Sequence, residues 1–396
     1  MADLRPFRGW IYDNSRVDPS KVLAPPYDVL SATERDELAK TDEHNCVKLI
    51  LPAGEGDAKY GEAKRLFDSW RKDGVLRQSE RPAVYRYHQI FEHPLDPGRT
   101  MTRRGFIAAV RLHTFGEKVI LPHERTLKGP KIDRLKLMDA TRAHLSQIFT
   151  LYSDPSGQSD LLFEASESSG TPVIDGVTAD GTRHRMWEVS DREVIGELRR
   201  IVGPINLYIA DGHHRYETML ALRDKLGEDA GAPLMANSSA NFGTLFVANM
   251  DDPGMVVMPT HRLIHSVADF DADRLLETAA EYFDLTEVDA NASAIRAALD
   301  KRERPAFVAV FPNRDRATVF ELRDRPATLA GVLGELDVTV LHELVLEAAL
   351  GIDKKAQEAK SNINYIKSDE AALAQVRGGH GQVCFMMRAT PVSQVK

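Results

Sequence analysis

The sequence has little cysteine, no long apolar run and no excess of positive charge. Its two cysteines, Cys46 and Cys384, cannot form a disulfide framework and have no short-spaced Cys/His ligand set beside them, which fits a reducing cytoplasm. No stretch approaches the roughly 18 apolar residues that span a bilayer, and the N-terminus lacks a signal pattern, so we expect neither secretion nor membrane insertion. The net charge of -8 argues against a surface that coats nucleic acid, although a local basic patch stays open.

The common nucleotide-binding and hydrolase signatures are also missing. The chain contains no Walker-type G-x-x-x-x-G-K-[ST], no dinucleotide-binding G-x-G-x-x-G and no G-x-S-x-G nucleophile elbow. Any nucleotide chemistry here must therefore use a different phosphate cradle.

What is present predicts an α/β (α+β) protein with more than one core. With 396 residues and 43% hydrophobic content, about two or three subdomains are expected. We predict an N-terminal α/β part over 1–152, a surface excursion or linker over 153–200, a core over 201–265 and a C-terminal α/β subdomain over 266–396. Residues 153–185 are rich in Ser, Asp, Gly and Thr, which favours a surface excursion or weak strands before 186–189. After 259–262, helical patterns begin near Asp269 and alternate with strands such as 306–311.

Several local signals predict N-terminal elements. The capping-box spacing Ser31-Ala32-Thr33-Glu34 predicts a helix from Ser31, and a second helix is expected over 59–72, ending at Gly74. Residues 83–90 and 104–112 alternate as strands do and should form an antiparallel pair, joined by a polar loop over 91–102.

The most informative segment is Asp211-Gly212-His213-His214-Arg215, where a strand-like run over 206–210 gives way to a helical pattern. We expect Asp211 to be the N-cap or pre-cap residue of a helix that ends after Lys225 at Gly227. A helix start offers unpaired N–H groups and the positive end of the helix dipole, and glycine lets a ligand approach the backbone.

Arg215 adds a bidentate donor for phosphate or carboxylate, and His213 and His214 can donate, accept or shuttle protons. We therefore predict a phosphate cradle with acid–base groups. The alternative is that Asp211 caps the helix and the histidines merely pack or face solvent. Adjacent residues on a helix point in different directions, so the two histidines are not expected to share a metal ion.

A second group of candidates follows the apolar run 119–121. His123 and Glu124 stand at its end, where a glutamate could act as a general base; the alternative is a solvent-facing turn. Lys131 and Arg134 follow and could bind a phosphate-bearing ligand, but a solvated basic turn fits almost as well.

Two further pairs of residues are candidates. Pro25 and Pro26 stiffen the loop that presents Tyr27 and Asp28. His261 and Arg262 follow the strand-like 255–257. His261 and His265 are four residues apart and could share a helical face as metal ligands, but no third ligand is near them. Whether this protein binds a metal stays open.

The motifs in this order resemble the domain-of-unknown-function family 1015, almost from end to end. The segments that carry the resemblance are Pro6–Gly9, Pro25–Val29, Pro122–Thr126, Lys131–Leu135, Ile209–Tyr216 and Pro259–Arg262. That family is similar to the ParB/sulfiredoxin-like superfamily, which implies a nucleotide-binding core with large insertions here. In that superfamily a G-x-x-R turn at a helix start binds nucleotide phosphates, and Gly212 and Arg215 fit that pattern.

The sequence departs from two branches of that superfamily. Sulfiredoxins carry Cys after the glycine, where this chain has His213, so thiol-based repair of sulfinic acid is excluded. ParB proteins have a DNA-binding helix-turn-helix after the turn, and none is recognisable here. Free-serine kinases of the superfamily are the nearer analogue, because they have a Pro-His-Glu motif and a turn like Asp211–Arg215.

The kinase resemblance implies a role for each candidate. Glu124 would deprotonate the serine hydroxyl, Arg215 and the helix start would hold the phosphates, Asp211 would orient the hydroxyl or Mg²⁺, and His213 or His214 would neutralise charge. His123, Gly212, Lys131 and Arg134 are assigned to phosphate binding, and Tyr27, Asp28, His261 and Arg262 to the substrate or its surroundings. The nucleotide is ATP or ADP, with Mg²⁺, and either direction of transfer, from ATP to serine or from phosphoserine, is open.

Two other functions stay open. One is a non-catalytic, ParB-like nucleotide-binding regulatory switch. The other is a metal-dependent hydrolase that uses His123, His213, His214 and His261. The expected partners are a nucleotide and a small-molecule substrate, with no membrane and no nucleic acid; a homo-oligomer is compatible with the sequence. The chain stops at Lys396, before the Met-Pro-x-Lys-Ser-Thr segment that usually ends the family, and both a complete and a shortened site stay open.

Overall fold

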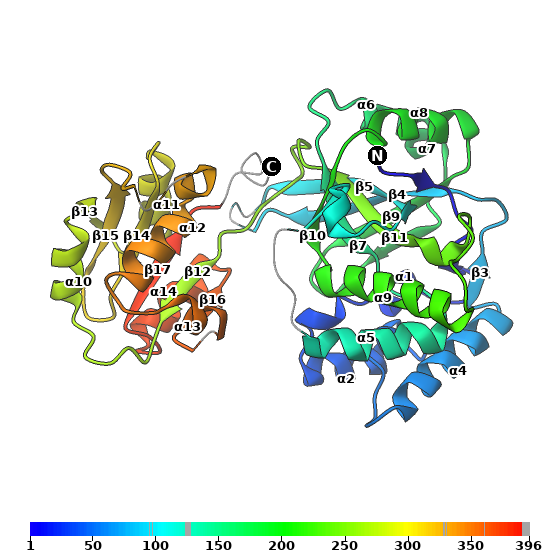
Figure 1. Ribbon diagram of the computed structural model, residues 1–396, viewed down its shortest axis with the longest axis horizontal. Coiled ribbons are helices and arrows are strands. Elements are labelled where there is room, and N and C mark those ends of the chain that lie inside the picture. The colour runs from blue at the N-terminus through cyan, green and yellow to red at the C-terminus, as the bar shows by residue number, and fades with distance from the viewer. Residues whose placement is uncertain are drawn as a thin grey trace. The chain divides into compact units, whose positions relative to one another are not determined.

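The computed structural model describes residues 1–94, 96, 98–122, 128–327, 329, 331–359 and 361–389 (Figure 1). The chain divides into two compact units, unit 1 over Met1–Val256 and unit 2 over Val257–Lys396. Each unit combines a large sheet with helices, so the predicted mixed α/β class is confirmed. The ParB/sulfiredoxin-like core stays a prediction.

Unit 1 is built on a nine-stranded sheet. Its strand order is β6 (Ile120–Leu121), β10 (Leu207–Asp211), β7 (Ile148–Tyr152), β11 (Phe242–Asn249), β5 (Thr100–Arg111), β4 (Val84–Glu92), β9 (Arg183–Val189) and β8 (Ile174–Val177), with β1 (Leu4–Arg5) paired to β5. The pairs β6/β10 and β7/β11 are parallel and the others are antiparallel. A separate hairpin pairs β2 (Trp10–Tyr12) with β3 (Leu76–Gln78).

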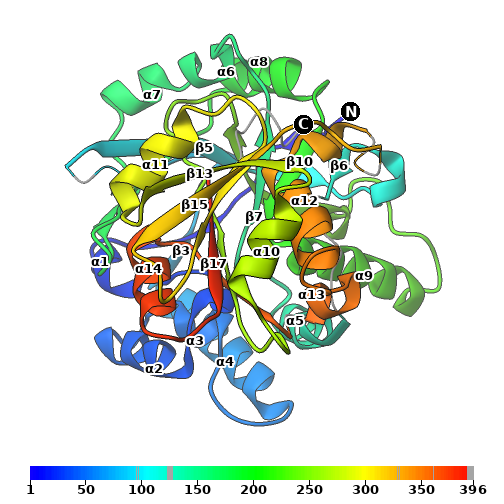
Figure 2. The same cartoon turned by 90° about the vertical axis from the view of Figure 1, so that its left-hand side faces the viewer.

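Helices lie on both sides of this sheet (Figures 1 and 2). One group comprises α6 (Gln158–Leu161), α7 (Glu164–Ser169) and α8 (Arg192–Val202), and the other includes α4 (Ala58–Lys72), α5 (Lys128–Thr141) and α9 (His213–Asp229). The short helices α1 (Pro19–Val22), α2 (Ala32–Thr41) and α3 (Val47–Ile50) complete the unit.

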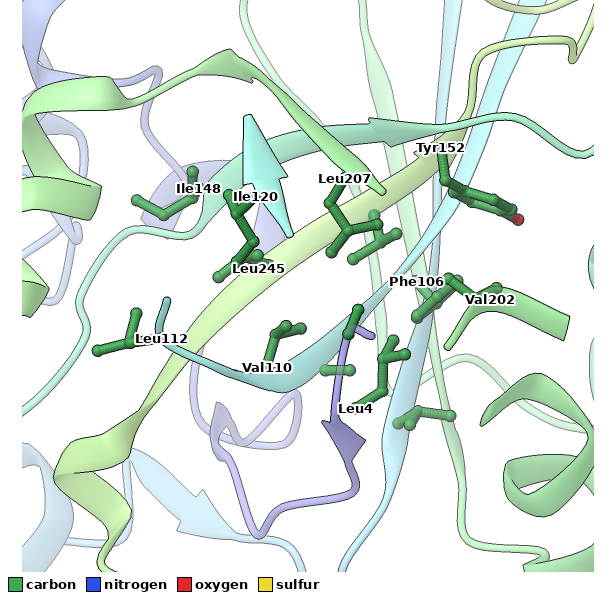
Figure 3. Close-up of a cluster of buried hydrophobic side chains, with 14 of the residues drawn as sticks. Leu4, Phe106, Val110, Leu112, Ile120, Ile148, Tyr152, Val202, Leu207 and Leu245 are labelled. Carbon is green, nitrogen blue, oxygen red and sulfur yellow. The ribbon is translucent and has the colours of Figure 1, made fainter. Parts of the chain in front are cut away.

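The core of unit 1 follows from strand alternation and helix periodicity. Phe106, Ala108 and Val110 alternate along β5 and enter one apolar cluster, as successive side chains of a strand point to opposite faces (Figure 3). Ile195 and Leu198 of α8 join the same cluster at helical spacing. Apolar burial of this kind contributes about 25 cal/mol per Å².

Several predicted elements of unit 1 are confirmed. Helix α2 begins after Ser31, whose side chain and Glu34 form the predicted capping box. Helix α4 matches the predicted second helix, and β4 and β5 are antiparallel. The strands extend to Glu92 and from Thr100, so the loop between them is shorter than the 91–102 predicted.

Other predictions for unit 1 differ from the structure. Helix α9 runs through Gly227 to Asp229, because the residue with the left-handed φ of 66° that ends a helix is Gly231. Lys131 and Arg134 lie in α5, not in a basic turn. The segment predicted as a surface excursion, 153–200, holds α6, α7, β8, β9 and most of α8.

Unit 2 contains a six-stranded antiparallel sheet. Its order is β13 (Phe283–Asp289), β15 (Arg316–Leu322), β14 (Ala306–Val310), β17 (Val383–Met387), β12 (His261–Ile264) and β16 (Ile363–Ile366). Figure 2 shows this sheet between two groups of helices, with α11 (Ala292–Asp300) and α14 (Asp369–Arg377) on one side and α10 (Ala272–Ala279), α12 (Asp337–Val340) and α13 (Lys354–Ala359) on the other.

Coverage on both faces explains the continuous apolar run of β14. Phe307 and Ala309 enter the cluster with α10, whereas Ala306, Val308 and Val310 enter the cluster with α11 and α14. His261 and Arg262 begin strand β12, so the predicted helical face shared by His261 and His265 is wrong. No helix in the described part of the chain is long and apolar enough to cross a membrane.

Candidate functional site

The turn between β10 and α9 is the centre of the candidate site. Asp211 is the last residue of β10 and Gly212 is the N-cap residue of α9, with a φ of 95° that L side chains rarely adopt. Asp211 therefore occupies the predicted pre-cap position, immediately before the N-cap residue. Its carboxylate pairs with the guanidinium of Arg215 one turn later.

Arg215 is nearly buried, with 5% of its surface exposed. Its NH1 donates to Ser146 Oγ at 2.7 Å and to the carbonyl oxygen of Gln147 at 2.6 Å, and its NH2 pairs with Asp211. No acceptor for Nε exists among the residues that the structure describes. The guanidinium also lies against Gly212, where an added Cβ would be 3.1 Å from Cζ. Two features thus meet at the helix start, an unsatisfied buried donor and a glycine that makes room for it.

A small cavity opens beside this guanidinium. It is lined by four side chains with polar groups and five apolar ones: Tyr27, Arg134, Ser146 and Arg215, and Ile50, Leu137, Met138, Ala143 and Leu145. Its volume is about 30 Å³, enough for one or two water molecules, so it can form the floor of a site and not hold a whole nucleotide. Apolar walls with a few converging polar groups are typical of ligand pockets.

Tyr27 connects this cavity to a predicted motif. The Cζ of Arg134 lies 4.1 Å from the centroid of the Tyr27 ring. Burial and the neighbouring Asp28 raise the pKa of Tyr27 against the opposing effect of Arg134, so its phenol remains a neutral hydrogen-bond donor. Asp28 itself is exposed.

The two predicted phosphate-binding cations of α5 already have carboxylate partners. Lys131 pairs with Glu217 of α9. Arg134 pairs with Asp133 and donates to the carbonyl oxygen of Ile50 at 2.5 Å. Burial opposes ionisation of Asp133, but hydrogen bonds from Lys59, Tyr60 and Arg134 outweigh it and hold the pKa of Asp133 well below its ordinary value. Arg134 therefore serves to hold Tyr27 and α5 in place.

The two histidines of the turn differ in exposure. His213 is 2% exposed, whereas His214 is half-buried. They point in different directions, as expected for neighbours on a helix. Among the described residues, no three His, Cys, Asp or Glu side chains meet in a way that could hold a metal ion.

The predicted base Glu124 and its neighbour His123 lie outside the described residues. The described chain on either side of them flanks the turn. In the parallel register, Leu207 pairs with Ile120 and Tyr208 with Leu121, so β6 and β10 end at the same edge of the sheet. The chain is described again from Lys128, at the start of α5, which packs along α9.

His261 and Arg262 have structural surroundings of their own in unit 2. His261 is 1% exposed; its Nε2 lies 2.8 Å from Asp369 Oδ1, and its Nδ1 accepts from the backbone N–H of Met387 at 3.1 Å. Both ring nitrogens are therefore occupied. Arg262 lies over the ring of Tyr365, with Cζ 5.5 Å from the centroid.

Sequence reasoning missed Ser146 and Gln147, which hold Arg215 from the N-terminal end of β7. The one available signal was a pair of polar residues before the β-forming run 148–152. The contact joins residues 69 positions apart, so no local pattern could reveal it.

One of three comparisons with known proteins agrees with the motif pattern. A family model described as "Protein of unknown function (DUF1015)" matches residues 4–339. No curated protein matches the chain. A solved structure of a conserved hypothetical protein from Pyrococcus furiosus is similar to it at 15% identity, with a TM-score of 0.31, over 70% of this chain and 79% of that one.

Proposed function

This chain belongs to the DUF1015 family, and we propose that it is a nucleotide-dependent phosphotransferase acting on a small hydroxyl metabolite, with free serine or phosphoserine as the favoured substrate. The observation that carries the proposal is Arg215. Its guanidinium is 5% exposed, its Nε donor is unsatisfied among the described residues, and it lines a cavity at the start of a 17-residue helix.

An anion at this turn would remove the cost of that donor. A buried donor without an acceptor costs about 1–3 kcal/mol, and a phosphate oxygen is a strong acceptor for a guanidinium. The helix start adds its N–H groups and the positive end of its dipole. The hydroxyls of Tyr27 and Ser146 are further donors at the same cavity. The turn therefore suits the phosphates of a nucleotide, whose remaining parts would lie outside the small cavity.

The proposed reaction needs a base next to the phosphate, and we assign that role to Glu124. The described chain on either side of Glu124 supports this assignment: β6 runs parallel to β10, and α5, which begins at Lys128, packs along α9. In the forward direction the serine oxygen attacks the terminal phosphorus of the nucleotide, the bond from phosphorus to the nucleotide oxygen breaks, and the serine proton passes to Glu124. From phosphoserine the same bonds form and break in reverse.

Asp211 would hold Mg²⁺ in this scheme. Its side chain is 49% exposed, so a carboxylate oxygen is accessible while it pairs with Arg215, and carboxylates together with substrate phosphates are the ligands Mg²⁺ prefers. Bound there, the ion would supply charge neutralisation on the phosphates. Arg215 would orient the phosphates, and His213 or His214 would neutralise charge that develops on them.

The test is phosphate transfer by the purified protein in the presence of Mg²⁺. L-serine is paired with ATP or ADP, and phosphoserine with ADP or AMP, with ³¹P NMR to identify products. Glu124→Gln and His214→Ala should lose turnover while retaining nucleotide binding, and His265→Ala, an imidazole change in unit 2, should retain both. Nucleotide binding without turnover on any of these substrates would overturn the proposal and favour a ParB-like regulatory switch.

A further inference from the structure

Arg103 of β5 is a partly buried cation with no carboxylate partner among the residues that the structure describes. Its Cζ lies 5.3 Å from the ring centroid of Phe91 and 5.6 Å from that of Phe149, and its NH1 donates to Gln89 Oε1 at 3.2 Å. In the described part of the chain, nothing accepts a hydrogen bond from its Nε and no acidic group pairs with it. Burial lowers the pKa of Arg103 from its ordinary value.

Other arginines of the same sheet are compensated. Arg86, which is 1% exposed, pairs with Asp160 at 2.7 Å and Glu167 at 2.6 Å. Arg104, the next residue along β5, lies 3.4 Å from Asp252. A guanidinium removed from water without an anion costs free energy, and cation–π contacts offset only about 2 kcal/mol of it. The missing partner of Arg103 is therefore an unusual feature that a bound anion would explain.

Arg103 lies on the sheet face that carries the candidate site. Asp211 pairs in register with Phe149 across β10 and β7, so the two side chains share one face of the sheet. The guanidinium of Arg103 approaches the ring of that same Phe149. Strands β10, β7, β11 and β5 follow one another in the sheet, so three intervals of about 4.8 Å separate the backbones of Asp211 and Arg103. The side chain of Arg103 reaches across this distance to the ring of Phe149, the residue that pairs with Asp211, so a ligand over Phe149 would have the guanidinium on one side and the turn on the other.

We infer that Arg103 binds the carboxylate of the small substrate and thereby selects amino-acid or hydroxy-acid substrates over alcohols that lack this group. The inference rests on the proposed function, in which the Arg215 turn takes the phosphates. A single guanidinium among neutral neighbours, Gln89, Phe91 and Phe149, matches one negative charge and not a phosphate dianion. The planar fork of arginine also fits the two oxygens of a carboxylate.

The kinetic test compares L-serine with ethanolamine, which has the same hydroxyl and amine but no carboxylate. Arg103→Gln should raise the KM for L-serine by roughly 10- to 100-fold, as expected for loss of a charge-assisted hydrogen bond, and leave ethanolamine kinetics unchanged. Arg104→Gln is the matched control, because it removes the same charge from the adjacent residue, and it should change neither. Arg103→Lys should restore only part of the L-serine affinity, since lysine keeps the charge and loses the fork. An unchanged KM for L-serine in Arg103→Gln would overturn the inference and leave the proposed function standing.

A binding test separates failure of the two ideas. Calorimetry compares phosphoserine with phosphoethanolamine, which differ by the carboxylate, on wild-type protein and Arg103→Gln. If the wild-type protein shows no phosphate transfer at all, the proposed function fails. The calorimetric comparison still tests whether Arg103 binds a carboxylate. A wild-type preference for phosphoserine that Arg103→Gln abolishes supports the subsite; equal binding of the two ligands by wild-type protein refutes it.

The unfolding temperature distinguishes a binding role of Arg103 from a purely structural one. Because Arg103 has no charged partner in the described ranges, Arg103→Gln without ligand should unfold at a temperature equal to or above that of wild-type protein. A lower unfolding temperature combined with an unchanged ligand preference would make Arg103 a structural residue and overturn the inference.

Discussion

Replacing Gly212 by alanine tests whether the turn before α9 needs glycine for its backbone conformation and for the space beside Arg215. At a φ of 95°, a residue with a Cβ costs roughly 1–2 kcal/mol more than glycine. The new Cβ would also lie 3.1 Å from Cζ, Nε and NH2 of Arg215, and moving a side chain off its rotamer costs about 0.5–1.5 kcal/mol. Together these terms predict a loss of about 1.5–3.5 kcal/mol in the free energy of unfolding of unit 1, and weaker nucleotide binding.

The assay is urea unfolding followed by tryptophan fluorescence. The chain has three tryptophans, Trp10, Trp70 and Trp187, and all belong to unit 1, so the signal reports this unit alone. The control is Gly196→Ala on α8, where an added Cβ meets no atom within 4 Å; it should stabilise the unit by about 0.5–1 kcal/mol. If Gly212→Ala is as stable as wild-type protein and binds nucleotide equally well, the reasoning that the turn requires glycine at this position is refuted.

Three further variants test the buried polar contacts. Arg215→Gln should cost about 1–3 kcal/mol in stability, because the guanidinium's hydrogen bonds to Ser146, Gln147 and Asp211 are lost. It should also abolish nucleotide binding, because the proposed phosphate ligand is removed; full affinity in a calorimetric titration with ADP would contradict this. Burial opposes ionisation of Glu167, but His88 and Arg86 lower its pKa to about 2, so its stabilisation is present above the unfolded pKa near 4.5 and is lost as pH falls toward 2. In Glu167→Gln, the free energy of unfolding of unit 1, measured in urea, should therefore fall less steeply between pH 5 and 2 than in wild-type protein. Equal slopes in the two proteins would disprove this. His261→Ala should speed hydrogen exchange at the Met387 amide, which donates to the imidazole, and unchanged exchange would contradict a structural role.

The parts of the fold that the sequence predicted correctly depend on short-range signals. The capping box at Ser31 lies within four residues, and the alternation of β4 and β5 is complete within each strand. Helix α5 was missed because its first turn contains Gly129 and Pro130, which are typical of loops. Its helical state is stabilised by packing along α9 and α4, which local propensity does not include.

In the candidate site, too, the short-range features were predicted and the pairing of side chains was not. The motif at residues 211–215 marked a helix start with a glycine and an arginine, and the structure has both there. The role of Asp211 as ion-pair partner of Arg215 could not be predicted, because the same carboxylate can cap a helix or pair with a guanidinium one turn away.

The sequence by itself determined the chemistry available to this protein: which residues could bind phosphate, which elements have local start and stop signals, and which familiar signatures are excluded. The tertiary structure alone decided which of those groups are already neutralised. Lys131 pairs with Glu217 of α9 and Arg134 with Asp133 of α5. Within the described ranges, by contrast, Arg103 has no carboxylate partner and the Nε of Arg215 has no acceptor. The physical reason is that contacts such as Lys131 with Glu217 and Arg215 with Ser146 depend on strand register and helix packing between residues far apart in the chain. Propensity and capping depend on neighbours a few positions away.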